Sequence, residues 1–245
     1  MATKTGTELV SAIKSHIGDR NNGKVGSVSV DSAIQDSINR ALYDITRKHS
    51  FKELEKIATI SITNSAYEYT MPTTDTDSNT ISIKNILVAT LQKAGETTVH
   101  RLVRINAQQR YRAYPDVSNT VTGYPSHYTE FATKLNVFPY PDDSYTLTLY
   151  ANTWPTLFVD ATLGNAHPLG EYVNDLIENF AVADIFYKLE QIDDASLFMG
   201  KYEMGLTRTI GAIRTKPDHD IPTTISHQAA NPAKQAFTGD YTGEI

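Results

Sequence analysis

Apolar side chains recur at helical spacing near both ends of the chain, and this pattern predicts four helices. The predicted ranges are residues 5–17, 30–49, about 168–192 and about 194–214. Gly18 is a stop signal for the first helix, and Ser29 or Asp31 can cap the second. Only a short connection at Asp193 and Asp194 separates the last two helices, so we expect them to form an antiparallel hairpin.

Between these helices the hydrophobic pattern changes to a period of two, which is typical of half-buried strands. Predicted β segments, separated by turn signals, cover residues 57–62, 67–69, 81–91, 97–103 and 123–150. A short helical insert is predicted at residues 105–114, where Pro115 ends it. Short strands without alternating long helices indicate an antiparallel sandwich or open barrel.

The order of the elements predicts an α+β fold. The N- and C-terminal helices form a small bundle, and an antiparallel β-sandwich or open barrel is inserted between them. We assign residues 1–56 and 165–215 to the helical bundle, and residues 57–164 to the β domain. The simplest packing brings the two N-terminal helices against the C-terminal helical hairpin, with the β domain projecting from the bundle.

Residues 216–245 differ from the rest of the chain. They are polar and rich in Pro and Gly, with isolated apolar residues at Ile221, Ile225, Phe237 and Tyr241. Spaced apolar anchors suit an extended segment that docks on a partner subunit, where the contacts offset the entropy of ordering. We therefore predict an extended C-terminal tail that takes part in an assembly.

The stretch of residues 123–155 carries a strong strand signal. Its alternating apolar positions are Phe131, Leu135, Val137, Tyr145, Leu147 and Leu149. Residues 139–143 contain two prolines and separate these positions into two runs, which predicts two antiparallel strands joined by a Pro-rich turn. None of these side chains forms a nucleophile, base or metal constellation, so we expect the function to come from assembly.

Composition narrows the class of protein. The chain has 245 residues, of which 40% are apolar, and this is ample for a buried core. No run approaches the roughly 18 apolar residues of a spanning helix, and the first residues lack the apolar centre of a signal peptide, so we expect a cytoplasmic site of synthesis. The absence of cysteine excludes disulfides, thiolate catalysis and Cys-type zinc sites. A net charge of -6 with scattered cations opposes tight non-specific DNA binding.

No sequence motif predicts catalysis or cofactor binding. Residues 18–24 have the Gly and Lys spacing of a phosphate-binding loop, but Val25 stands where Ser or Thr should bind magnesium, so we interpret them as an interhelical loop. The seven histidines show no metal-ligand spacing, and surface or capping roles are expected for them. Ser126 and His127 precede the aspartates of residues 139–143 without a nucleophile elbow. We predict a protein that is not an enzyme and binds no cofactor.

Residues 75–79 open like a calcium-binding loop. Thr80 replaces the turn glycine, however, and Ile86 stands where the bidentate Glu belongs. We therefore expect a solvated turn, and leave open a weak cation site at Asp75 and Asp77.

One run of residues combines cations with aromatic side chains. It consists of Arg101, Arg104, Arg110, Tyr111, Arg112 and Tyr114. Such residues can clamp phosphates or stack on bases, but Arg and Tyr are also favoured at protein interfaces. Because the chain is acidic overall, we favour an intersubunit surface, for which the two Asp-rich turns are candidate partners.

Several segments recur in one known family of proteins. They are YEYTMP at residues 67–72, GYP at 123–125 with Tyr128, LNVFPYPD at 135–142 and YTLTLY at 145–150. In this order, after a helical start, they resemble the head-to-tail adaptor (connector) proteins of short-tailed bacteriophages, especially the tail tubular protein A group. The resemblance covers about residues 30–210.

This resemblance implies a structural virion protein at the head-tail interface, made in the host cytoplasm. Such adaptors form a homo-oligomeric ring, commonly of twelve copies, beneath the portal protein and continuous with the tail nozzle or tail tube protein. DNA passes through the lumen without sequence-specific binding, and no membrane is involved.

Within that framework each part of the chain has an expected role. We expect the helical bundle, the arginine and tyrosine run and the C-terminal tail to contact the portal or neighbouring subunits. The predicted tail-side interface consists of Pro139, Tyr140, Asp142 and Asp143. The alternative is a β-sandwich ligand-binding or carbohydrate-binding tail component, supported only by exposed tyrosines and Trp154.

Overall fold

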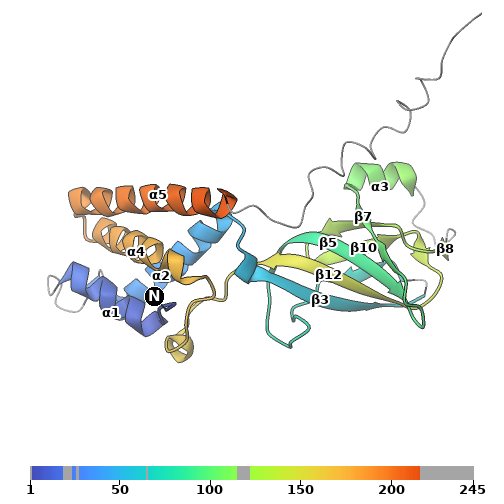
Figure 1. Ribbon diagram of the computed structural model, residues 1–245, viewed down its shortest axis with the longest axis horizontal. Helices are drawn as coiled ribbons and strands as arrows, with labels where there is room; N and C mark the ends of the chain where they lie inside the picture. The colour runs from blue at the N-terminus through green and yellow to red at the C-terminus, as the bar shows by residue number, and fades with distance from the viewer. Residues whose placement is uncertain (1, 19–23, 26–27, 65, 115–121, 216–245) are drawn as a thin grey trace, which may run out of the picture. The chain divides into compact units, whose positions relative to one another are not determined.

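The computed structural model describes residues 2–18, 24–25, 28–64, 66–114 and 122–215 (Figure 1). The chain is divided into two compact units, Met1–Leu206 and Thr207–Ile245. All the described helices and strands belong to the first unit, except for the C-terminal part of the last helix. The predicted C-terminal tail and most of the glycine-containing loop at residues 18–24 lie outside the described residues.

All four predicted long helices are present; three have ends close to those expected, whereas the third begins about six residues later than predicted, after a 3-10 turn at Glu171–Val173. They are α1 (Gly6–Ile17), α2 (Val30–Lys48), α4 (Asn174–Lys188) and α5 (Ile192–Thr215), the last of which continues into the second unit. A capping box between Thr5 and Glu8 starts α1, and the Ser29 side chain accepts a hydrogen bond from Ser32 N at the start of α2. A short antiparallel pair, β1 (Lys24–Val25) and β2 (Val28–Ser29), precedes α2.

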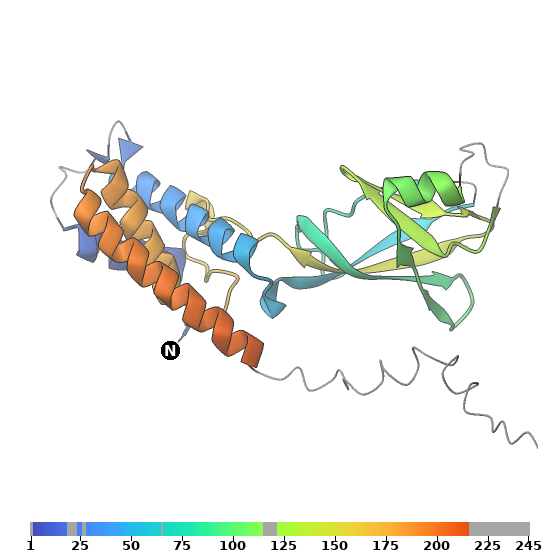
Figure 2. The ribbon, with the colours of Figure 1, turned by 90° about the horizontal axis from the view of Figure 1, so that it is seen from above.

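The helices form a bundle in which α1 and α2 both contact α4, as Figures 1 and 2 show. The apolar stripes of α1 and α2 are fully buried, for example at Leu9, Ile34 and Leu42. Through the middle of the helix, α5 also joins the bundle, because Tyr202 donates a hydrogen bond of 2.5 Å to Asp44 Oδ2 of α2. The predicted packing of terminal helices is therefore confirmed.

Two four-stranded sheets make up the β region. One has the order β3 (Glu55–Ile62), β12 (Tyr145–Thr153), β5 (Ile83–Lys93) and β6 (Val99–Arg101). The other has the order β4 (Glu68–Thr70), β10 (Lys134–Phe138), β9 (His127–Phe131) and β7 (Val103–Arg104). Apolar side chains from both sheets form one buried cluster, including Leu91, Leu147, Leu135 and Val137, so the region is a β-sandwich.

Most neighbouring strands are antiparallel, as predicted. The exceptions are the parallel pair β7 and β9, and a small parallel pair, β8 (Thr122–Gly123) and β11 (Tyr140–Pro141). The short helical insert is also present as α3 (Ala107–Ala113), which starts with a capping box between Asn106 and Gln109. The α+β class with an inserted sandwich is thus confirmed, whereas the exact domain boundaries stay a prediction.

The predicted pairing within residues 123–155 is wrong. β10 and β12 belong to different sheets, and the Pro-rich segment carries the chain from one sheet to the other. The hairpin partner of β10 is β9, joined to it by a tight turn at which Ala132 has a φ of 52°. Phe131, expected in the core, is 71% exposed beside this turn. Alternation shows that each run has a buried face, but it does not identify the strand beside it.

Candidate interaction surfaces

The arginine and tyrosine run occupies one side of the sandwich. β6 and β7 are the edge strands of the two sheets, and the buried Leu102 connects them directly. All the residues of both strands are exposed, and α3 lies on the outside of the sandwich (Figures 1 and 2). We call β6, β7 and α3 the basic edge. Unpaired edge strands of this kind are ready templates for contacts with another chain.

Aromatic packing attaches α3 to the sandwich. The Arg110 guanidinium lies 4.6 Å from the Tyr111 ring centroid and 5.1 Å from that of Phe138. Tyr114 stacks on Phe138 with ring centroids 5.4 Å apart, and its hydroxyl is 3.1 Å from His127 Nδ1. Tyr111, in contrast, is 60% exposed. The helix is thus held by Arg110 and Tyr114, while Tyr111 is available for a partner.

Among the described residues, most cations of the basic edge have no ion pair. Arg104 Nε pairs with Glu130 Oε1 at 3.1 Å. Burial raises the pKa of Glu130, and the Arg104 charge opposes that rise. Within the described part of the chain, no ion pair involves Arg101 or Arg112, and both are exposed. The edge therefore presents positive charge on an otherwise acidic protein.

The predicted tail-side turn has buried and exposed members. Tyr140 is buried and packs on Tyr67 with ring centroids 4.9 Å apart, so its ring supports the turn from within the subunit. Pro139 is half-buried, and Asp142 is exposed. Asp142 accepts a hydrogen bond from the Tyr145 hydroxyl, and burial together with this bond raises the pKa of Tyr145.

Asp143, the last of the predicted tail-side residues, is half-exposed and already paired. Its Oδ2 lies 3.0 Å from Lys93 Nζ, and its Oδ1 accepts a hydrogen bond from the Ser144 amide. These two interactions lower the pKa of Asp143. The aspartates of this turn therefore have partners within the subunit.

The turn at residues 75–79 is exposed at four of its five residues, as expected for a solvated turn, and Asp75 is the exception. Asp75 is buried, and its Oδ1 accepts hydrogen bonds from the amides of Asp77 (3.0 Å) and Asn79 (2.8 Å). The side-chain amide of Asn79 also donates to Asp75 and is the main cause of its lowered pKa. Asp77 is exposed, and the neighbouring Thr76 amide donates to Ile57 O of β3. The Asp75 carboxylate thus builds the turn, and among the described residues no group of three metal-ligating side chains occurs.

Two histidines test expectations from the sequence: His127 for a catalytic triad, and His167 for the surface position of the histidines. Ser126 Oγ lies 2.8 Å from His127 Nδ1, but Asp142 and Asp143 interact with Tyr145 and Lys93 instead of completing a triad. His167 corrects the expectation of surface histidines, because it is buried, with Nε2 2.7 Å from Asn174 Oδ1, and burial lowers its pKa.

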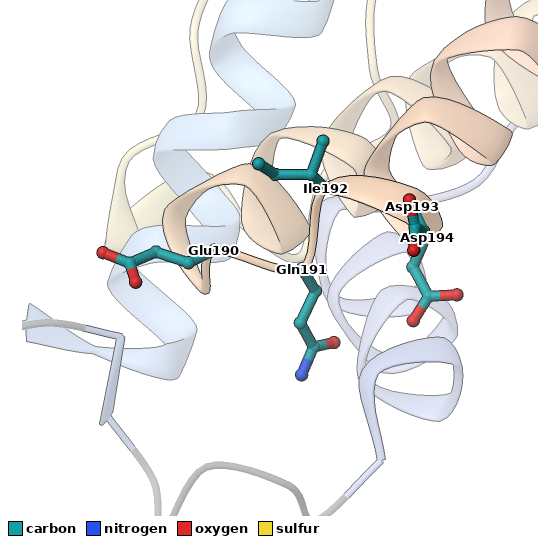
Figure 3. A pocket seen from close by; sticks show the side chains of 5 residues that line it. All are labelled: Glu190, Gln191, Ile192, Asp193 and Asp194. Carbon is teal, nitrogen blue, oxygen red and sulfur yellow. The ribbon is translucent and has the colours of Figure 1, made fainter.

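A hollow of about 660 Å³ lies beside the connection between α4 and α5 (Figure 3). Its described lining includes Glu190, Gln191, Ile192, Asp193 and Asp194. Glu190 points away from Asp193 and Asp194, so the three carboxylates do not converge (Figure 3). Aspartates in the first turn of α5 are explained by the helix dipole, and the hollow supplies no ligand chemistry of its own.

The tryptophan that supported the carbohydrate-binding alternative is engaged within the subunit. The Trp154 ring contacts Tyr43 of α2 at a centroid distance of 5.5 Å, and Lys84 Nζ lies 5.4 Å from its centroid. An aromatic platform for a sugar needs a free ring face. These contacts remove the main observation in favour of that alternative.

The described residues thus form a β-sandwich with an exposed basic edge, joined to a helical bundle. The comparison with protein families is specific. A family model described as "SU10 adaptor protein" matches residues 4–228, so the chain belongs to the SU10 adaptor protein family. It is a structural adaptor of a bacteriophage and a virion component, which confirms the resemblance to head-to-tail adaptors.

A comparison with curated proteins found no significant match to the sequence. None of the helices in the described ranges is both long and apolar enough to span a bilayer. The predicted tail residues Ile221, Ile225, Phe237 and Tyr241 lie outside the described residues.

Proposed function

We propose that copies of this adaptor form a closed ring that joins the portal to the tail nozzle and encloses the passage for DNA. The observation that carries the proposal is the match of residues 4–228 to an adaptor family. The exposed basic edge supports it, since a ring subunit needs surfaces that contact other chains. Twelve copies is the expected ring size.

The charge of the subunit suits a channel through which DNA must move. The formal net charge is -6, and the cations that the structure describes are dispersed or paired outside the basic edge. Tight DNA binding requires clustered cations that release counterions from the phosphates. A mildly acidic lumen would let DNA slide during packaging and ejection.

The roles of the individual parts remain those expected from the sequence. The helical bundle and residues 216–245 engage the portal or a neighbouring subunit, and the turn at residues 139–143 faces the tail. The exposure of Asp142 supports the second assignment. Reversing the charges of Asp142 and Asp143 should then weaken attachment of the tail and leave ring formation intact, which sedimentation of assembled particles would measure.

Particle mass with and without portal protein tests the proposal. We expect the full-length protein to form a ring of defined mass on the portal, measured by native mass spectrometry or mass photometry. Truncation after Arg214, at the C-terminal end of α5, should weaken portal binding and leave the subunit folded. A full-length protein that stays monomeric and does not bind the portal would contradict the proposed function.

A further inference from the structure

The sandwich has two open sides, and each is formed by one edge strand from each of the two sheets. On one side are β6 and β7, which form the basic edge with α3; on the other side are β3 and β4. The connection between β3 and β4 is short and held by Tyr69, whose hydroxyl donates to Ala66 O at 2.6 Å. The turn at residues 75–79 is attached to β3 through the hydrogen bond between Thr76 N and Ile57 O. We call β3, β4 and this turn the acidic edge.

The two sides carry opposite net charges. Residues 97–114, which build the basic edge, contain four arginines and neither Asp nor Glu. The acidic edge contains Glu55, Glu68, Asp75 and Asp77 and one cation, Lys56 of β3, whose charge contributes to the lowered pKa of Asp75. Local pairing reduces these charges, since Arg104 pairs with Glu130 and Glu68 lies 3.4 Å from Lys134. Positive charge still remains on one side and negative charge on the other.

Apolar side chains accompany these charges. On the basic edge, Val99 and Val103 are 55% and 56% exposed, and Tyr111 is 60% exposed. On the acidic edge, Ile57 is 41% exposed. A contact between the two sides would bury apolar surface as well as pair charges, and both contributions favour association.

We propose that the basic edge of one adaptor subunit docks on the acidic edge of the next copy, so that the sandwiches contact each other head to tail around the ring. The contact is heterologous, because two different surfaces of the same chain meet, and such contacts generate a ring when the rotation from one copy to the next closes on itself. Arg101 and Arg112 of one copy approach Asp77 and Glu68 of its neighbour. This inference rests on the proposed ring and names the surfaces that build it.

The structure also favours one of the two Asp-rich turns, residues 75–79, over the other, residues 139–143, as the partner for the arginines of the basic edge. The aspartates of residues 139–143 interact with Lys93 and Tyr145, and they lie in the connection between β11 and β12, outside β3 and β4. The turn at residues 75–79 is attached to the edge opposite the arginines and exposes Asp77. A surface on the opposite edge is what a repeating head-to-tail contact needs.

A charge swap between two full-length variants tests the docking surfaces. Arg101→Glu with Arg112→Glu places negative side chains at both proposed contact positions of the basic edge, and Asp77→Lys with Glu68→Lys places positive side chains at both proposed contact positions of the acidic edge. Each variant alone, with portal protein present, should show a fall of about tenfold or more in assembled ring, because like charges meet at every contact. An equimolar mixture should restore rings in which the two variants alternate, detected by native mass spectrometry.

The controls distinguish this inference from the proposed function. Circular dichroism and thermal melting should show both variants folded, since the substituted side chains are exposed. Rings formed by either variant alone, or a mixture that fails to assemble while wild type does, would overturn the edge-to-edge contact and leave the ring itself standing. A wild-type protein that forms no ring on the portal would instead defeat the proposed function.

Discussion

Asp184 of α4 is the centre of a polar network that joins α4 to α2. Ser37 Oγ donates to its Oδ2 at 2.6 Å, Lys188 Nζ lies 2.8 Å from the same oxygen, and Arg40 Nη1 lies 3.3 Å from Oδ1. Burial alone would raise the pKa of Asp184, but hydrogen bonds from Lys188 and Ser37 outweigh burial, and the pKa is lowered. The ionised carboxylate therefore stabilises the contact between the two helices.

Asp184→Asn keeps the shape of the side chain and removes its charge. A hydrogen bond to a charged group contributes about 1.5–3 kcal/mol and one between neutral groups about 0.5–1.5 kcal/mol, so the bonds from Ser37 and Lys188 should each weaken by about 1 kcal/mol. The Arg40 side chain is 60% exposed, so its ion pair adds little in water. We expect the free energy of unfolding to fall by about 2 kcal/mol at pH 7. Asp36→Asn, at an exposed position of α2, is the matched control and should change it by less than about 0.5 kcal/mol.

The pH dependence identifies the charge as the cause. The pKa of Asp184 is lower in the folded chain than in the unfolded chain, so its contribution is full above the unfolded value of about 3.9 and is lost as pH falls through the folded value. The difference between wild type and Asp184→Asn should therefore shrink as pH is lowered from 7 to about 3. Urea unfolding followed by circular dichroism measures this difference, and an equal difference at both ends of the range would refute the reasoning.

Two further pairs of variants test the packing. Leu147→Ala empties a fully buried position of the sandwich and should cost about 2–5 kcal/mol of unfolding free energy, whereas Thr146→Ala, on the exposed face of the same strand, should cost little in the same urea titration. Gly200→Ala, with open space at its Cβ, should stabilise α5 by about 1 kcal/mol. Gly205→Ala should melt at a lower temperature than Gly200→Ala, because its Cβ would lie 2.7 Å from Leu176 Cδ2, and equal melting temperatures would contradict this packing.

The candidate interaction surfaces can be predicted from the sequence where they depend on residue type alone. The run from Arg101 to Tyr114 was identified from its composition, and the structure places it on an exposed edge. In the turn at residues 75–79, sequence spacing does not show that the buried Asp75 carboxylate accepts hydrogen bonds from the turn's own amides. Tyr140 is similar: its Pro-rich surroundings indicated an exposed turn, whereas Tyr67 covers its ring.

The sequence by itself determined the helices, the buried faces of the strands and the class of fold, because periodicity is a property of neighbouring residues. Leu135, Val137 and Leu147 were placed in the core on that basis alone. Only the tertiary structure decided that β10 and β12 join different sheets, since strand pairing depends on contacts between residues far apart in the chain. The same long-range pairing sets the arginines and Asp77 at opposite edges of one sandwich, and on that arrangement the head-to-tail contact depends.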